Sequence, residues 1–277
     1  MKTSITKFLD RFTQSFAGQD PIIFSVLANI FSMRIIGNKT HGDLAEIALT
    51  EYINQFVKGF SAKHTGKEKF RAKVLEEDIR VHDEETGESL PLSIKTYGSG
   101  PLQLSTNKES SMFPYLKEKV DEDVIKDEAK IKEILKHGVF ASFKSVNVLP
   151  LIYNEKQMNF KIIIFDLLRA YRSVKKIEFF GPRKYGGNRE TFPIYKFFGK
   201  EDQYIFEVRY GDAKANALQR GMWTHTENAK PFFKELLHGT YQINEPLINL
   251  ISKILVSKRD KHLEILKLFP APEKSVI

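Results

Sequence analysis

Three residues of one expected β-hairpin have the types and spacing needed for metal or acid–base chemistry. Asp78 precedes a polar turn, and Ser93 and Lys95 follow that turn two residues apart. Side chains alternate along a strand, so Ser93 and Lys95 share one face. With a turn centred between Thr86 and Gly87, Asp78 lies directly opposite Lys95 and shares that face. The pattern predicts that a carboxylate, a hydroxyl and an ammonium lie close together.

A solvated cross-strand ion pair is the simplest interpretation, and such a pair contributes about a few tenths of a kcal/mol. The sequence LPLSIK argues for more, because the strand is apolar up to Lys95 and a buried ammonium needs a carboxylate or a developing negative charge. Upstream, the helical sequence HGDLAEIALTEYI places Glu46 on or beside its apolar side. Glu46 and Asp78 together could chelate Mg²⁺, which proteins hold with few carboxylates, waters and substrate phosphate. Lys95 would then stabilise charge on a phosphate or position a water molecule.

The order of a helix glutamate, a strand aspartate, a tight turn and a strand lysine resembles the core of the PD-(D/E)xK nucleases. Type II restriction endonucleases are the most similar members, and the resemblance covers about residues 40–105. It implies an α/β fold with a mixed central β-sheet flanked by helices. It also implies Mg²⁺-dependent hydrolysis of a DNA phosphodiester by an activated water. In that family Glu46 would be the helix carboxylate, Asp78 the metal-binding aspartate and Lys95 the catalytic lysine.

The sequence departs from the family pattern at two positions. Glu77 stands where the family has proline, and Ser93 stands where an acidic residue is usual, although some members have a neutral polar residue there. With Ser93 neutral, Asp78 would carry most of the metal binding, and the backbone carbonyl of Ile94 would be a further ligand. We therefore include Ser93 with the expected catalytic residues.

Two other carboxylates compete for the metal-binding roles. Glu51 lies on the same expected helix as Glu46 and is an alternative to it. Asp83 is an alternative to Asp78, but it would lie near the turn, away from Lys95. The residues alone leave both alternatives open.

Three polar segments offer donors for DNA. The first is a loop with two glycines after Lys95, the second is the basic segment FFGPRKYGGNRETF, and the third is VRYGDAKANALQRGMWTHT. Arg and Lys can pair with guanine, and Asn with adenine. The alternatives are an ordinary loop, a basic turn, and a buried tryptophan with structural polar neighbours or a nucleotide pocket in which it stacks on a base. The candidate DNA-binding residues are Gln103, Asn107, Lys108, Arg183, Lys184, Arg189, Lys214, Asn216, Gln219, Arg220, Trp223 and His225.

The charge distribution favours a polyanionic partner. The chain of 277 residues carries a formal net charge of +8, and residues 161–230 hold 14 Lys and Arg against 8 Asp and Glu, with 13 aromatic residues. Basic residues interleaved with aromatics suit a nucleic-acid surface, although a strand-rich core with outward-facing Lys and Arg gives the same composition.

Several classes of protein are excluded or disfavoured by what the sequence lacks. The chain has no cysteine, which excludes disulfides, zinc–thiolate sites and cysteine nucleophiles and is consistent with a cytoplasmic location. It has no apolar run long enough to span a membrane, and its first residues do not resemble a signal peptide. HExxH, P-loop and GxSxG motifs are absent as well.

The surrounding elements are expected to form a single domain over residues 1–277, because no repeat or linker between domains is visible. Hydrophobic spacing and turn residues predict the local structure. The expected elements are two helices within 4–36 separated near Pro21, a helix within 37–60 with Thr40 as N-cap, a linker at 61–73, a hairpin within 76–105, a helix or helix pair at 115–137, a strand followed by a helix within 160–180, strands at 193–198 and 203–210, and helices within 228–258.

These features together predict a Mg²⁺-dependent, sequence-specific endonuclease of double-stranded DNA. Palindromic recognition would favour a homodimer, because two-fold DNA symmetry is matched by two-fold protein symmetry. A non-catalytic basic nucleic-acid-binding protein, with Asp78 and Lys95 as a surface pair, is the main alternative. A structural or assembly protein with a basic surface is the third.

Overall fold

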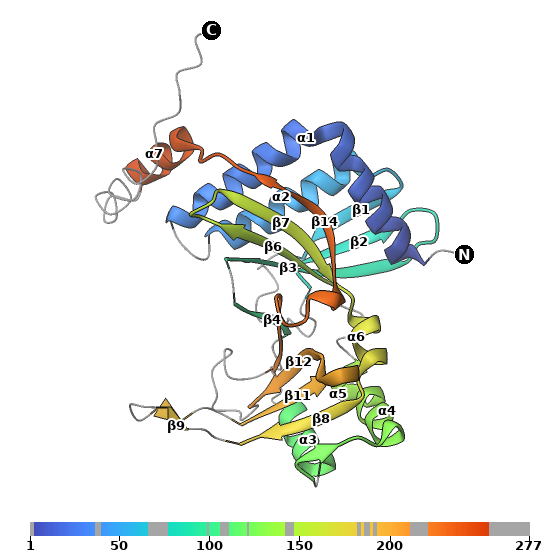
Figure 1. Cartoon of the computed structure of the whole chain (residues 1–277). Coiled ribbons are helices and arrows are strands. Elements are labelled where there is room, and N and C mark those ends of the chain that lie inside the picture. The colour runs from blue at the N-terminus through green and yellow to red at the C-terminus, as the bar shows by residue number, and fades with distance from the viewer. Residues whose placement is uncertain are drawn as a thin grey trace.

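The structure is a computed structural model of the chain. It describes residues 3–36, 40–65, 77–98, 100–105, 111–120, 122–141, 147–181, 184–185, 189–190, 193–210 and 221–254. Within these residues the strands form two six-stranded sheets and one two-stranded hairpin, flanked by helices (Figure 1). The helices are α1 (Ser4–Ile36), α2 (Thr40–Phe56), α3 (Met112–Lys119), α4 (Glu128–Lys136), α5 (Gly138–Ala141), α6 (Leu167–Ser173) and α7 (Glu245–Ile254), with 3-10 turns at Lys200–Asp202 and Lys230–Phe232.

The first sheet is mixed and has the strand order β1-β2-β3-β6-β7-β14. Its neighbours pair antiparallel except for β3 and β6, which run parallel. The expected α/β class with a mixed sheet flanked by helices is therefore confirmed. The strands of this sheet are β1 (Phe60–His64), β2 (Ile79–Asp83), β3 (Ser89–Tyr97), β6 (Asn147–Asn154), β7 (Asn159–Phe165) and β14 (Phe233–Thr240).

The second sheet is antiparallel throughout and has the order β4-β13-β12-β11-β8-β5. The chain passes repeatedly between the sheets, for example from β3 to β4 and from β13 to β14. Neither sheet is therefore formed by one contiguous stretch of sequence. The strands of the second sheet are β4 (Pro101–Ser105), β5 (Val124–Ile125), β8 (Lys176–Phe180), β11 (Ile194–Phe198), β12 (Tyr204–Arg209) and β13 (Gly221–His225). The separate hairpin consists of β9 (Lys184–Tyr185) and β10 (Arg189–Glu190).

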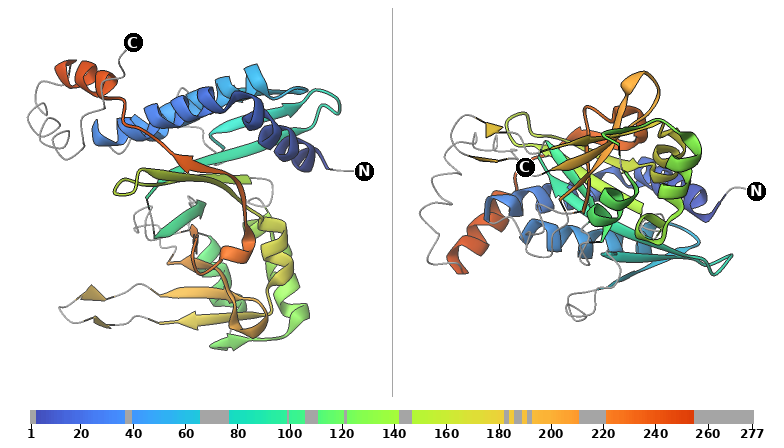
Figure 2. Two further views of the ribbon diagram at one scale, coloured as in Figure 1. Left: turned by 45° about the horizontal axis from the view of Figure 1, so that its top comes forward. Right: turned by 90° about the horizontal axis from the view of Figure 1, so that it is seen from below.

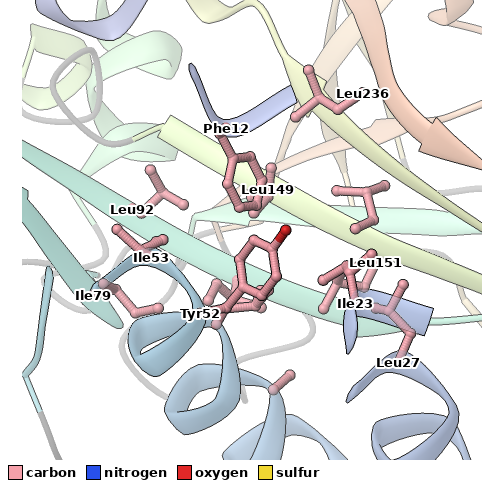
Figure 3. Packing of buried hydrophobic residues seen from close by; sticks show 14 of the residues in the cluster. Phe12, Ile23, Leu27, Tyr52, Ile53, Ile79, Leu92, Leu149, Leu151 and Leu236 are labelled. Carbon is pink, nitrogen blue, oxygen red and sulfur yellow. The ribbon is translucent and has the colours of Figure 1, made fainter. Parts of the chain in front are cut away.

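Helices α1 and α2 cover one face of the first sheet, and the second sheet lies on the other side (Figure 2). The apolar spacing of both helices directs their large side chains into one core with alternate residues of β2, β3 and β6. Figure 3 shows Phe12 and Tyr52 packed over Leu92 and Leu149, and the rings of Phe12 and Tyr52 are 6.1 Å apart. Truncating a buried leucine in such a core costs about 2–5 kcal/mol, so this packing holds the hairpin against α2.

A second core lies on one face of the second sheet and is covered by α3, α4, α5 and α6. Residues Phe197 and Phe206 stack in it with ring centres 4.3 Å apart. Val148 and Phe165, from the first sheet, also belong to this core. The face of the first sheet that α1 and α2 leave uncovered is thus partly packed against the second core.

Five expectations about the elements need correction. Residues 4–36 form one helix with Pro21 inside it, and Figure 1 shows the change of helix direction that a proline without an N–H produces. The expected linker begins with strand β1, and the glycine-containing loop after Lys95 contains strand β4. Strand β6 was not anticipated from the sequence, because Pro150 interrupts its apolar run. Strand β14 occupies part of the segment expected to be helical.

Candidate active site

The β2–β3 hairpin has a register two residues away from the one expected. Ile79 pairs with Leu92 and His82 with Ser89, and the side chain of Asp78 bonds to Ser93, so Asp78 lies beside Ser93 rather than opposite Lys95. The prediction that Asp78 faces Lys95 directly is wrong. A shift of two residues keeps every side chain on its expected face, because side chains alternate with a period of two. Asp78, Ser93 and Lys95 therefore remain on one face.

The turn explains this register. Oδ1 of Asp83 accepts hydrogen bonds from the backbone N–H groups of Glu85 (3.0 Å) and Thr86 (3.2 Å). Gly87 has a φ of 70°, a conformation that glycine adopts without strain, and its N–H donates to the Asp83 carbonyl over 2.8 Å. Asp83 then pairs with Glu88, which centres the turn one residue earlier than expected.

Asp78 is held in place from both neighbouring strands. Its backbone N–H donates to the carbonyl of Leu92 over 2.8 Å, and its own carbonyl accepts from the N–H and hydroxyl of Thr65 over 3.0 and 2.6 Å. Its side-chain Oδ2 accepts from the Ser93 hydroxyl over 3.0 Å and from the Ile94 N–H over 2.8 Å. These bonds fix a nearly buried carboxylate at the end of the hairpin.

Lys95 emerges on the face of the first sheet opposite to α2. Ile94 packs in the core beneath α1 and α2, so alternation turns Lys95 and Tyr97 to the other face. Tyr97 packs against the second core, and burial raises the pKa of its hydroxyl to about 12. Lys95 is half-buried, and the described residues contain no ion pair between it and Asp78. The candidate site therefore faces the second sheet.

Glu46 lies on α2 and contacts the end of strand β1. Its Oε2 is 2.9 Å from Nε2 of His64, and the side chains of Glu46 and His64 are 17% and 28% exposed. His64 pairs with Ile79, the residue after Asp78, so Glu46 reaches the same end of the sheet as Asp78. Glu46 approaches from the face of α2, whereas Lys95 extends from the other face.

The two competing carboxylates have different surroundings. Glu51 is exposed on α2, away from the side that packs against the sheet. Asp83 is 1% exposed and serves the turn. Burial would raise the pKa of Asp83, but hydrogen bonds with Ser4 and with the turn residues outweigh burial, and the pKa is lowered.

Glu77, at the position of the family's proline, forms a two-point ion pair with Arg80. The guanidinium donates through Nε to Oε2 over 3.2 Å and through its terminal nitrogen to Oε1. Glu77 is 7% exposed, so this pairing neutralises a buried carboxylate beside Asp78. Of these two neighbouring carboxylates, Asp78 is the one whose side chain bonds to the second strand of the hairpin.

The donor types at this end of the sheet fit Mg²⁺. Asp78 and Glu46 offer hard carboxylate oxygens, and Mg²⁺ is commonly held by one or two carboxylates, with waters and substrate phosphate completing the octahedron. No cluster of three or more His, Asp or Glu suitable for a metal occurs in the described part of the chain. The Ser93 hydroxyl and the Ile94 N–H both donate to the Asp78 carboxylate. Metal binding by the Ile94 carbonyl stays a prediction.

Most of the candidate DNA-binding side chains cannot be placed. Asn107, Lys108, Arg183, Lys214, Asn216, Gln219 and Arg220 lie outside the described residues. Lys184 and Arg189 lie in the β9–β10 hairpin, whose backbone pairs Lys184 with Glu190 and Tyr185 with Arg189.

Three of these candidates lie in the second sheet. Gln103 on β4 pairs with Trp223 on β13, and His225 follows two residues later. Trp223 is 7% exposed, and the guanidinium of Arg209 lies 3.9 Å from the centre of its ring. One face of the indole is therefore covered by a cation of the same sheet.

His64 and Thr65 are site residues that the sequence reasoning missed. Both lie in the stretch expected to be a linker, where neither a repeat nor a spacing marks them. The one available signal is the β-favouring sequence FSAKH, which follows α2 and precedes the hairpin. Their roles depend on β1 pairing with β2, which local sequence does not reveal.

Comparison of the chain with protein-family models, with curated proteins and with solved structures finds no match. None of the helices in the described part of the chain is long and apolar enough to cross a membrane. A functional proposal must therefore rest on the chemistry and geometry of the residues themselves.

Proposed function

We propose that the chain is a Mg²⁺-dependent, sequence-specific endonuclease of double-stranded DNA, similar to type II restriction endonucleases of the PD-(D/E)xK superfamily. One observation carries the proposal: the Asp78 carboxylate is fixed to Ser93 and Ile94 at the end of a hairpin, and Lys95 follows on the face of Ser93. A carboxylate can hold a metal ion and an ammonium can stabilise charge on a phosphate, so these two groups suit metal-dependent phosphodiester hydrolysis.

Each residue has a defined role in this proposal. Asp78 and Glu46 would hold Mg²⁺, which supplies Lewis-acid stabilisation of the phosphate and a more acidic water when bound. Ser93 and the Ile94 N–H orient the Asp78 carboxylate, and His64 orients Glu46. The ammonium of Lys95 stabilises negative charge that develops on the phosphate oxygens.

The arrangement of elements supports the proposal. Helix α2 precedes the β2–β3 hairpin, as in the order that the resemblance gives, and the hairpin belongs to a mixed sheet with helices on one face. The net charge of +8 favours a polyanionic substrate. A homodimer would match the symmetry of a palindromic site.

The test is cleavage of plasmid DNA with Mg²⁺ by the wild type, Lys95→Ala and a matched lysine control. We expect the wild type to linearise plasmids that carry its recognition sequence and Lys95→Ala to lose at least about 100-fold in rate, as removal of one transition-state donor does. Lys63→Ala is the control, because Lys63 is an exposed lysine on strand β1 of the same sheet. Equal rates for wild type and Lys95→Ala, or no cleavage by either across varied DNA, would exclude the proposed role of Lys95.

The alternative is a non-catalytic nucleic-acid-binding protein. It is favoured by the net charge of +8, which suits a polyanionic partner without requiring catalysis. This alternative predicts duplex binding in Ca²⁺ with steep salt dependence, unchanged or strengthened in Asp78→Ala, and no cleavage after Mg²⁺ is added. A structural or assembly protein would bind no duplex at moderate salt.

A further inference from the structure

The outer face of the second sheet carries a row of charged and polar side chains across five strands. In the ladder, Glu178 on β8 pairs with Lys196 on β11, which pairs with Glu207 on β12. Glu207 then pairs with Trp223 on β13, and Trp223 with Gln103 on β4. The opposite face of this sheet is apolar and belongs to the second core.

The two carboxylates of this row are engaged by groups other than Lys196. Glu178 forms an ion pair with Lys176 over 2.9 Å. Glu207 accepts from Nε of Arg209 over 2.9 Å and from the hydroxyl of Tyr204 over 3.2 Å.

Lys196 is therefore a cation without an ion-pair partner among the described residues. Its ammonium lies 4.5 Å from the centre of the Phe180 ring. This contact orients the cation, and the two carboxylates beside it in the ladder bond to other groups rather than forming a close ion pair with it.

A surface cavity of about 290 Å³ opens beside this cation. Phe198 and Tyr204 supply aromatic walls. Its size, close to the lower end of the range of small-molecule sites, suits a small ligand or one nucleotide unit. The charged and polar lining residues include Lys196, Glu207, Arg209, His225 and Asn228.

His225 provides an independent sign of a ligand. Its Nδ1 atom is buried and has no hydrogen-bond partner in the described structure. Buried polar atoms are nearly always hydrogen-bonded, so this ring nitrogen lacks the partner that it would normally have. Nδ1 is shielded from the cavity, so the His225 ring would have to turn for an Nδ1–H group to donate to an anion held by Lys196.

We propose that this cavity binds a phosphate group, supplied either by a free nucleotide or by the backbone of a nucleic acid. Lys196 and His225 are the donors to the phosphate oxygens, and the aromatic walls suit the attached nucleoside. Arg209 and Tyr204 already donate hydrogen bonds to the Glu207 carboxylate, so this carboxylate does not repel the anion strongly. The proposal does not require the chain to cleave DNA.

Binding is measured by isothermal titration calorimetry in EDTA, which prevents Mg²⁺-dependent cleavage. The probes are inorganic phosphate, a nucleoside 5′-monophosphate and a short DNA duplex. Trp223 is the single tryptophan of the chain and lies against Arg209, so its fluorescence gives a second readout of the same site.

We expect Lys196→Ala to weaken binding about tenfold or more, since the phosphate loses one charge-assisted hydrogen bond. Lys161→Ala is the control, because Lys161 lies on the first sheet with a side chain 60% exposed. Circular dichroism confirms folding, and Lys196→Gln replaces Lys196→Ala if the alanine variant does not fold. His225→Ala should also weaken binding of the same probe.

The arms of the experiment distinguish the two sources of phosphate. Mononucleotide binding that competes with inorganic phosphate identifies a free nucleotide as the ligand. Duplex binding whose salt slope falls by about one in Lys196→Ala identifies a backbone phosphate. Absence of heat and of fluorescence change with all probes, or equal affinity in wild type and Lys196→Ala, overturns the proposal.

One further variant separates this proposal from the proposed nuclease activity. Asp78→Asn should lose cleavage but keep phosphate binding at the cavity. Loss of both in a folded Asp78→Asn protein would show that the bound phosphate belongs to the candidate active site.

Discussion

The hydroxyl of Ser93 donates to Oδ2 of Asp78 over 3.0 Å at a point where Ser93 is fully buried and Asp78 is 9% exposed. The pair links the residue before β2 to strand β3. The hydrogen bond fixes the orientation of the Asp78 carboxylate, and we expect the stability of the hairpin to depend on it.

Ser93→Ala should lower the free energy of unfolding by about 1–3 kcal/mol, because a buried carboxylate loses one of its donors. Urea denaturation gives this value. Ser61→Ala is the matched control, since Ser61 is a half-buried serine on β1 whose hydroxyl has no hydrogen bond to a described residue. Equal effects of the two substitutions would show that the Ser93–Asp78 bond contributes nothing.

Ser93→Asp tests whether Asp78 can hold a divalent cation. Without metal, two adjacent carboxylates repel, so this variant should be less stable than Ser93→Ala in EDTA. Mg²⁺ should raise its thermal midpoint more than that of the wild type, because a ligand that binds only the folded state stabilises it. Ser61→Asp should show no such Mg²⁺ response. An equal response in all three proteins would argue against a cation at Asp78.

Sequence patterns predicted the elements of the hairpin but not its register. The apolar sequence LPLSIK predicted a strand inside the protein, and Leu92, Ser93 and Ile94 of β3 are buried. The register depends on whether Asp83 or Thr86 begins the turn, and both are turn-forming residues. The Asp83 side chain decides this by accepting two backbone N–H groups, a choice that local propensity does not make.

The division of the strands between two sheets depends on contacts between distant residues. Strand β14 pairs with β7, about 70 positions earlier, and its burial pattern has one buried residue, Leu236. The hydrophobic residues of this segment have no strong helical or strand periodicity. Pairing with β7 therefore decides its structure, and the predicted helix does not form there. The contact between Glu46 and His64 is hidden for the same reason, because it requires β1 to join the sheet beside β2.

Glu46→Gln should reduce Mg²⁺-dependent cleavage about tenfold or more if Glu46 is the helix carboxylate of the site. His64→Gln should reduce it less, because His64 acts on Glu46 through one hydrogen bond of 2.9 Å. The double variant should then lose little more than Glu46→Gln alone, a non-additivity expected of residues in contact. Loss of cleavage in Glu51→Gln but not in Glu46→Gln would assign the role to Glu51 instead.

Gly239→Ala tests whether β14 packs as a strand against α1. A Cβ atom at Gly239 would lie 2.6 Å from a ring carbon of Phe24 and 3.2 Å from one of Phe160. We expect a loss of about 1–3 kcal/mol in the free energy of unfolding, as overpacking of a well-filled contact produces. Gly138→Ala is the control, because a Cβ there meets no atom within 4 Å. An unchanged stability in Gly239→Ala would contradict the packing of β14 on Phe24.

Asp83→Asn should make the stability of the protein less dependent on pH in the acid range. Burial raises the pKa of Asp83, but hydrogen bonds from Ser4, Glu85 and Thr86 outweigh burial and lower the pKa below its usual value of 3.8. The folded state therefore binds fewer protons than the unfolded state just below pH 3.8, so stability falls as the pH falls through the folded pKa. This contribution is complete above the unfolded pKa, and asparagine cannot titrate, so the variant loses that part of the acid dependence.

Urea denaturation at a series of pH values between about 2 and 7 measures the effect of Asp83→Asn as a shallower fall of stability toward acid. Glu84→Gln is the control, because Glu84 is an exposed carboxylate of the same turn. At neutral pH the asparagine variant should stay folded, since its side-chain oxygen can still accept from Glu85 and Thr86. If Asp83→Asn and wild type lose stability in parallel as the pH falls, then the Asp83 carboxylate does not hold the turn that sets the hairpin register.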